Sequence, residues 1–123
     1  MSGPLFSSSG AAHLLDYRGR KVRLFRKTWQ LKLSHPERGF LTWHYEDLQL
    51  TLREPVQVVE SRSDPDVHLY YREIRRLQLR QGMFVPAPPW VRFLCVLVNI
   101  RRDLVVTFYP TDNPKKGRNV WPT

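Results

Sequence analysis

The chain has few of the residues that build covalent or phosphate-binding frameworks. Its only cysteine, Cys95, can form no internal disulfide, and its place in a long apolar run is typical of a buried structural thiol. The six glycines never cluster, and no Gly-Lys-Ser/Thr follows a predicted strand, so no phosphate-binding loop is expected. No apolar run is long enough to cross a bilayer as a helix, and Met1–Pro4 does not begin a signal peptide. A cytoplasmic location is therefore expected.

Metal ligands and acidic residues are also scarce. The four histidines are scattered, with no His-x-x-x-His or Cys-x-x-Cys spacing, so we expect neither a metal nor another cofactor. Eleven acidic residues stand against twenty Lys and Arg, which gives a net charge of +9. Such an imbalance favours a polyanionic partner, with nucleic acid ahead of a membrane surface. The alternatives are a charge that serves solubility and a basic protein that binds an acidic one.

Apolar residues are concentrated in two neighbouring segments, Val91–Ile100 and Leu104–Tyr109. The short polar stretch between them predicts an antiparallel hairpin. Both faces of each segment are largely apolar, which places the hairpin in the middle of a sheet that is covered on part of both faces. The residues expected in the core are Leu48, Leu52, Phe93 or Leu94, Val96, Val98 and Val106.

The N-terminal third predicts a tail, a hairpin and two helices. Residues 1–13 are rich in Ser, Gly and Ala and predict a flexible tail, which leaves 14–123 as a single domain. Gly19 supplies the turn of a small hairpin. Thr28 is a plausible N-cap for a helix over Thr28–Ser34, and apolar spacing predicts a second helix over Leu41–Arg53.

The rest of the chain reads mainly as strands. Val56–Glu60 and Val67–Ile74 predict two strands, and Arg75–Pro89 predicts a long connection to the apolar hairpin. The expected fold class is therefore α+β. Its two N-terminal helices pack on a twisted antiparallel sheet of about four strands, and a small β-hairpin precedes them.

The histidines are the candidates for proton transfer. His35 lies at the predicted C-terminal end of the first helix, where the helix dipole favours imidazolium. A histidine that titrates near neutral pH suits general acid–base catalysis, and the alternative is a histidine that only caps the helix. His68 shares a strand face with Tyr70 and Arg72, and this trio lines either a groove or an ordinary wet face.

The last predicted strand leads into a basic loop. Thr107 and Tyr109 share one face of the strand, and the loop that follows carries Lys115, Lys116 and Arg118. A hydroxyl and a phenol beside basic groups suit a phosphate, whereas the alternative is a solvated lysine loop.

Short motifs in a fixed order give the chain a resemblance to a known family. They are Asp16-x-x-Gly19-x-x-Val22-x-Leu24, Trp29, His35-Pro36-Glu37, Leu52-x-x-Pro55-x-x-Val58, Leu69-Tyr70-Tyr71-Arg72, Val96-x-Val98, Val105-Val106-Thr107-x-Tyr109, Lys116-Gly117 and Trp121. This series resembles the barnase–EndoU–colicin–RelE-like (BECR-fold) nucleases that are associated with phages and mobile elements. The resemblance covers about Asp16 to Trp121.

The resemblance implies metal-independent cleavage of RNA. In that mechanism the ribose 2′-hydroxyl attacks the adjacent phosphorus and leaves a 2′,3′-cyclic phosphate. The family's histidine before Pro-Glu falls on His35, its strand-borne arginine on Arg72, and its last-strand Thr and Tyr on Thr107 and Tyr109. By analogy with toxin-like members, an acidic antitoxin protein is an implied partner. The chain departs from the family at Phe108, where Ala is common, and in the length of its Arg75–Pro89 connection.

Two functions from different classes follow. The first is a toxin-like endoribonuclease in which His35 is an acid or base, Arg72, Thr107 and Tyr109 complete the site, and Lys115, Lys116, Arg118 and Tyr70 bind RNA. The second is a non-catalytic module that binds RNA or DNA. In it, Tyr70, Trp90 or Trp121 would stack on bases. A basic protein-interaction domain is a further alternative.

Overall fold

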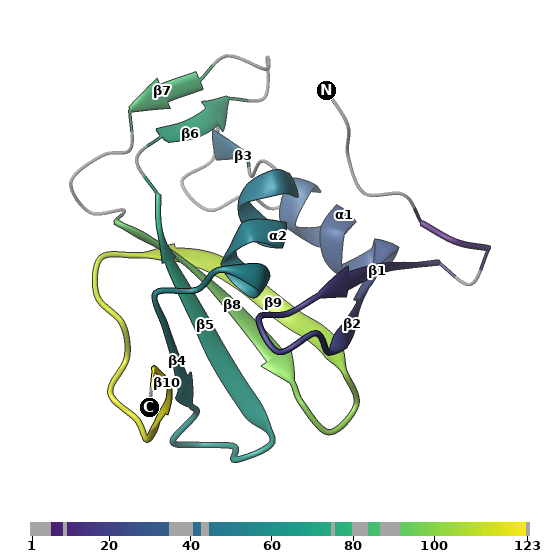
Figure 1. Ribbon diagram of the computed structural model, residues 1–123. Coiled ribbons are helices and arrows are strands. Elements are labelled where there is room, and N and C mark those ends of the chain that lie inside the picture. Colours follow the sequence, from purple (N-terminus) through teal and green to yellow (C-terminus); the bar gives the residue numbers. More distant parts are fainter. Residues whose placement is uncertain are drawn as a thin grey trace.

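The computed structural model (Figure 1) describes residues 6–8, 10–34, 41–42, 45–74, 76–79, 84–86 and 92–122. These residues form a seven-stranded sheet, a three-stranded sheet and two helices. In chain order the elements are β1 Ala11–Leu15, β2 Lys21–Phe25, α1 Arg26–Ser34, β3 Leu41–Thr42, α2 Tyr45–Arg53, β4 Gln57–Glu60, β5 Val67–Glu73, β6 Arg76–Leu79, β7 Phe84–Pro86, β8 Phe93–Asn99, β9 Leu104–Thr111 and β10 Asn119–Trp121.

The large sheet is mixed, with strand order β1-β2-β9-β8-β5-β4-β10. β8 occupies the central place, so the prediction that the apolar hairpin lies in the middle of a sheet is confirmed. The predicted four-stranded antiparallel sheet with two helices is wrong. The N-terminal hairpin joins the sheet itself, through a parallel pairing of β2 with β9, and β10 adds a strand at the other edge.

Three element boundaries also differ from the sequence prediction. β1 takes in Ala11–His13, which were assigned to the flexible tail, because Ala11 and Ala12 are buried on pairing with β2. α1 begins at Arg26, so Thr28 is not its N-cap. Leu41 and Thr42 pair with β6 as a strand, and α2 begins only at Tyr45. Local apolar spacing does not reveal such a pairing, because its partner is distant in sequence.

The small sheet has the order β3-β6-β7, and its strands β6 and β7 lie within the predicted Arg75–Pro89 connection. Figure 1 shows it beyond the helices, at the end of the molecule away from the C-terminus. The connection is therefore partly built of strands.

Both helices pack on the same face of the large sheet (Figure 1). Trp29 of α1 stacks on Phe108 of β9 at 5.7 Å between ring centroids, and its edge meets Tyr45 of α2. Leu48 and Leu52 of α2 are fully buried. The remaining core on this helix-covered face comes from Ile74, just after β5, and from the strands: Ala12, Leu14, Val22, Leu24, Val58, Tyr70, Leu94, Val96, Val98, Val105 and Phe108.

The opposite face of the sheet carries a smaller cluster. Its buried members are Val59, Val67, Leu69, Tyr71 and Cys95, with Phe93, Leu97 and Tyr109 partly buried beside them. We call this the open face, because α1 and α2 lie on the other side. The segment 112–118 crosses part of it, as the contacts described below show.

Val106 is a correction to the predicted core. The β8–β9 register passes from Leu97↔Thr107 to Val98↔Val105, so Val106 is an extra residue in a β-bulge. Val105 therefore takes the buried place, and Val106 is 44% exposed. The other predicted core residues, Leu48, Leu52, Leu94, Val96 and Val98, are buried.

Candidate nucleic-acid interface

The residues predicted to form one site are divided between the two faces of the sheet. Directly paired residues on neighbouring strands share a face. Tyr70 and Arg72 pair with Val96 and Leu94, on the helix-covered side. Thr107 and Tyr109 pair with Leu97 and Cys95, on the open side. The structure therefore does not bring Arg72 or Tyr70 together with Thr107 and Tyr109.

His35 lies outside the described residues, as does Trp90. The predicted approach of His35 to Arg72, Thr107 or Tyr109 stays a prediction. His68, Tyr70 and Arg72 do share one face, as their alternation along β5 predicts.

Tyr70 and Arg72 have structural partners. The Tyr70 ring is 2% exposed, and its hydroxyl donates a hydrogen bond to Asp16 Oδ2 at 2.9 Å. Arg72 Nη1 donates to the carbonyl oxygen of Glu54, just after α2, at 2.6 Å. A basic side chain at this position satisfies a carbonyl that the helix leaves unpaired. Tyr70, predicted to bind RNA, and Arg72, predicted to complete the catalytic site, therefore both make hydrogen bonds within the fold.

Asp16 organises the turn between β1 and β2. Its Oδ1 accepts hydrogen bonds from the backbone N–H groups of Arg18 and Arg20, at 3.0 and 2.9 Å. Gly19 in this turn has φ +82°, a conformation that glycine adopts without strain. Asp16 is itself 4% exposed. Because its other oxygen is bonded to Tyr70, the carboxylate ties the turn to β5.

The turn presents an aromatic pair to the surface. The Tyr17 ring meets the edge of the Tyr70 ring at 5.9 Å between centroids and lies against Trp121 of β10 at 5.3 Å, tilted by 35°. The Arg18 guanidinium carbon lies 5.3 Å from the centroid of the Tyr17 ring. Trp121 is 39% exposed. Figure 1 shows the β1–β2 turn on the same side of the large sheet as α2.

Three arginines and one carboxylate act on the titration of His68. The pKa of His68 is lowered, first by burial and then by the charges of Arg20, Arg18 and Arg118, and Glu60 opposes the shift. Glu60 is the cross-strand neighbour of His68, and Arg118 Nη2 contacts Glu60 Oε1 at 2.8 Å. We call the set Tyr17, Arg18, Arg20, His68, Arg118 and Trp121 the aromatic–arginine surface.

The turn between β8 and β9 packs against the β1–β2 hairpin. Arg20 Nη1 donates to the carbonyl oxygen of Ile100 at 3.2 Å, and Arg23 Nη2 donates to that of Arg102 at 2.7 Å. Arg20 also lies 3.7 Å from the Asp103 carboxylate. These contacts fix the hairpin on the sheet, while the Arg101 and Arg102 side chains remain exposed and add positive charge nearby.

The open face holds the other predicted residues. The backbone N–H of Lys115 donates to the Tyr71 hydroxyl at 2.9 Å, and Lys115 Nζ lies 5.6 Å from the centroid of the Tyr109 ring. A side chain at Gly117 would meet the Glu60 carbonyl oxygen at 2.4 Å, so only glycine allows the segment to lie this close to β4.

A groove of about 490 Å³ opens beside this segment. Its lining includes Lys115 and Lys116 and residues 60–63. The aliphatic side chains of Val59, Leu69 and Leu97 complete it.

Burial raises the pKa of three groups on the open face, Cys95, Tyr71 and Tyr109. It raises the pKa of the Cys95 thiol to about 11, which the neighbouring Tyr71 and Tyr109 hydroxyls partly offset. It also raises the pKa of both tyrosines well above their usual range. Tyr109 Oη is buried, and it has no hydrogen-bond partner of ordinary geometry within the described ranges. All three groups are therefore protonated near neutral pH, when a tyrosine hydroxyl can donate a hydrogen bond but cannot act as a base.

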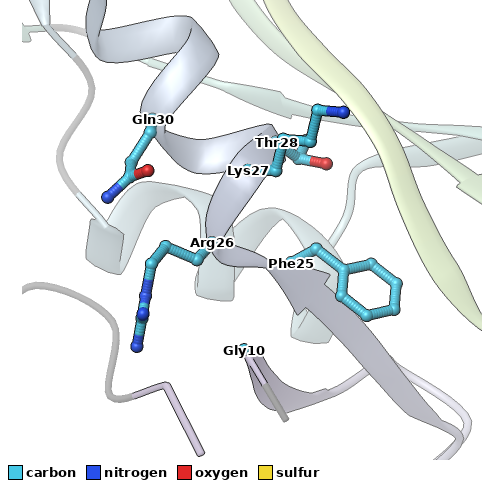
Figure 2. Close-up of a pocket in the computed structure, with 6 residues that line it drawn as sticks. All are labelled: Gly10, Phe25, Arg26, Lys27, Thr28 and Gln30. Carbon is cyan, nitrogen blue, oxygen red and sulfur yellow. The ribbon is translucent and has the colours of Figure 1, made fainter.

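A second cavity, of about 510 Å³, lies at the N-terminal end of α1 (Figure 2). It is lined by Gly10, Phe25, Arg26, Lys27, Thr28 and Gln30. Figure 2 shows the Arg26 and Gln30 side chains on the same side of the helix. The Arg26 guanidinium carbon lies 5.3 Å from the centroid of the Phe6 ring. The backbone N–H of Arg26 donates a hydrogen bond to the Gly10 carbonyl oxygen. The cavity shares no residue with the aromatic–arginine surface.

The sequence predicted some residues of the aromatic–arginine surface as functional, but it did not predict that they lie together. Trp121 was predicted as a stacking residue, Arg118 as a phosphate ligand, and His68 as part of either a groove or a wet face, whereas Tyr17, Arg18 and Arg20 were missed. The Tyr-Arg-Gly-Arg turn was the available signal, because two cations closely follow an aromatic residue there.

Within the part of the chain that the structure describes, no cluster of three or more His, Cys, Asp or Glu side chains could hold a metal ion. Among the same residues, no helix is both long and apolar enough to span a membrane. Comparison with family models, curated proteins and solved structures finds no match to this chain.

Proposed function

We propose that the protein binds single-stranded RNA at the aromatic–arginine surface. The observation that carries the proposal is the partly exposed Trp121 ring lying against Tyr17, with Arg18 lying over Tyr17. Surfaces that bind single strands combine aromatic rings, on which bases stack, with cations that follow the phosphates. Arg18 and Arg118 supply such cations around His68.

An unpaired strand fits this surface better than a duplex. A base stacks on Trp121 only if it is free of its own neighbours, as in loops and single strands. The net charge of +9 adds a long-range attraction for phosphates. RNA is preferred to DNA because the motif resemblance points to an RNA ligand.

The direct test is the affinity of Trp121 variants for a labelled oligoribonucleotide, measured by fluorescence anisotropy. Trp121→Ala should weaken binding roughly 5- to 150-fold, since one base stack contributes about 1–3 kcal/mol. Trp121→Phe should retain most of the affinity, and the same RNA as a duplex should bind more weakly. Wild-type affinity in Trp121→Ala would contradict the proposal.

The contribution of charge is tested with two exposed arginines, Arg18 at the surface and Arg92 as its matched control. Arg18→Ala should weaken binding, because it removes a cation beside the aromatic pair. Arg92→Ala removes the same charge beside Phe93, on a residue outside the surface, and should leave the affinity nearly unchanged. Equal losses would mean that only net charge matters.

A second candidate function is metal-independent endoribonuclease activity on the open face. It is favoured by the meeting of two predicted site residues there, Lys115 and Tyr109, with Thr107 on the same face. In this hypothesis His35 is the acid or base, and Lys115 and Lys116 stabilise the phosphorane charge. Arg72 lies on the other face and takes no part.

This candidate is tested by incubating RNA with the protein in the presence of a chelator and identifying the products. Cleavage should leave a 2′,3′-cyclic phosphate, and His35→Ala should slow it by roughly 10²–10⁴-fold. Trp121→Ala is the companion variant, because it should weaken binding without moving the catalytic group. Intact RNA after incubation with the wild-type protein would leave binding as the function.

A further inference from the structure

We infer that His68 is a phosphate ligand of the aromatic–arginine surface, that it binds in the imidazolium form, and that RNA binding therefore takes up a proton. The inference rests on the proposed function and adds a residue and a proton to it.

The first step is the position of His68. It lies on β5 between Glu60 of β4 and Val98 of β8, and it is partly exposed on the face that carries Tyr17 and Trp121. His68 precedes Tyr70 by two residues on the same face of β5, and the Tyr17 ring contacts the Tyr70 ring. This order places His68 next to the aromatic pair along the strand, where we put the phosphate of a stacked nucleotide.

The second step is the set of charges around the imidazole. The β1–β2 turn contributes Arg18 and Arg20, the segment before β10 contributes Arg118, β4 contributes Glu60, and β8 contributes only apolar Val98. The Asp16 carboxylate is bonded to the Tyr70 hydroxyl and to backbone N–H groups of its own turn.

The third step is the state of His68 in the free protein. Burial and three arginines hold its pKa below the usual value, and Glu60, which opposes them, is paired with Arg118. The imidazole is therefore largely neutral near pH 7. Arg118 is paired with Glu60, and Arg20 lies 3.7 Å from the Asp103 carboxylate. Arg18 is therefore the cation of the three that a phosphate beside the neutral imidazole would meet first.

The fourth step is what a phosphate does there. A negative charge within a few ångströms favours the imidazolium form and raises the pKa of His68. Between its lowered pKa in the free protein and its higher pKa in the complex, His68 is neutral before binding and protonated after it. RNA affinity should then rise as the pH falls through this window and level off outside it.

The experiment uses oligouridylate of roughly twelve nucleotides, a length that one such surface can bind. Its bases do not titrate between about pH 5 and about pH 8, the range in which histidine changes its charge. Affinity is measured across this range at constant ionic strength. Calorimetry in two buffers of different ionisation enthalpy counts the protons taken up.

For the wild-type protein we expect tighter binding at the acidic end, by up to tenfold per pH unit within the window, with an uptake approaching one proton. His68→Gln should abolish both the pH dependence and the uptake while it retains binding at the alkaline end. His13→Gln is the control, because His13 is exposed on β1 and lies outside the surface; it should behave as the wild type.

Two failures are distinguishable. If oligouridylate binds but neither affinity nor proton uptake depends on His68, the inference is overturned and the proposed function stands. If oligouridylate does not bind at any pH, or binds equally well to Trp121→Ala, the proposed function falls and the inference falls with it.

Discussion

At the scale of single residues, the buried carboxylate of Asp16 joins the β1–β2 turn to β5. It accepts hydrogen bonds from two backbone N–H groups of its own turn and from the Tyr70 hydroxyl. A buried acceptor with three donors fixes both the shape of the turn and its place over β5.

We predict that Asp16→Ala lowers the free energy of unfolding by about 3 kcal/mol, because it leaves the Tyr70 hydroxyl buried without its acceptor. Chemical denaturation checks the value. Tyr70→Phe removes only one donor and should cost less, about 1–2 kcal/mol. A smaller loss for Asp16→Ala than for Tyr70→Phe would show that the turn does not depend on the carboxylate.

At the scale of elements, the apolar hairpin shows how far sequence patterns reach. The pattern predicts its two strands and its central place, because long runs of β-branched residues suit a sheet covered on both faces. The bulge at Val106 is not readable from the sequence, because strict alternation backwards from Phe108 assigns Val106 to the core. Pairing with β8 decides otherwise.

Two neighbouring valines therefore give a matched test. Val105→Ala should lower the free energy of unfolding by about 2 kcal/mol, as expected for a truncation in a packed core. Val106→Ala, which removes the same atoms from an exposed side chain, should change it by less than about 0.5 kcal/mol. Thermal denaturation of both variants checks the difference, and equal losses would mean that the bulge is misplaced.

The helices show a second limit of local patterns. Apolar spacing predicts α2 and its buried Leu48 and Leu52, and both are confirmed as core residues. The same spacing extends the helix back to Leu41, where pairing with β6 holds the backbone in a strand. A pairing between distant segments overrides the local preference.

At the scale of the whole molecule, the charge of +9 is concentrated in part around the aromatic–arginine surface and the adjoining Arg101 and Arg102. If RNA binds there, affinity should fall steeply with salt, because phosphate contacts release counterions.

We predict that the log–log slope of affinity against salt becomes shallower by about 1.4 in the Arg18→Ala, Arg118→Ala double variant, since each lost phosphate contact on a single strand contributes about 0.7. The double variant Lys115→Ala, Lys116→Ala removes the same charge on the open face and should leave the slope unchanged. If the lysine pair alone changes the slope, RNA binds along the groove instead.

The division of the predicted site belongs to this scale as well. Alternation within a strand correctly groups His68 with Tyr70 and Arg72, and Thr107 with Tyr109. Whether those groups share a face depends on the register across β8, which no local pattern contains. The Tyr17–Trp121 contact is hidden for the same reason, because it joins opposite ends of the chain.

That contact has a consequence for shortened chains. β4, β5, β8 and β9 lie side by side and are complete by Thr111, so the centre of the large sheet does not depend on β10. Arg118 and Trp121 come after Thr111, and without them Tyr17 has no aromatic partner on β10. We expect a chain cut at Thr111 to keep its sheet and to lose its hold on RNA, so that one truncation separates folding from binding.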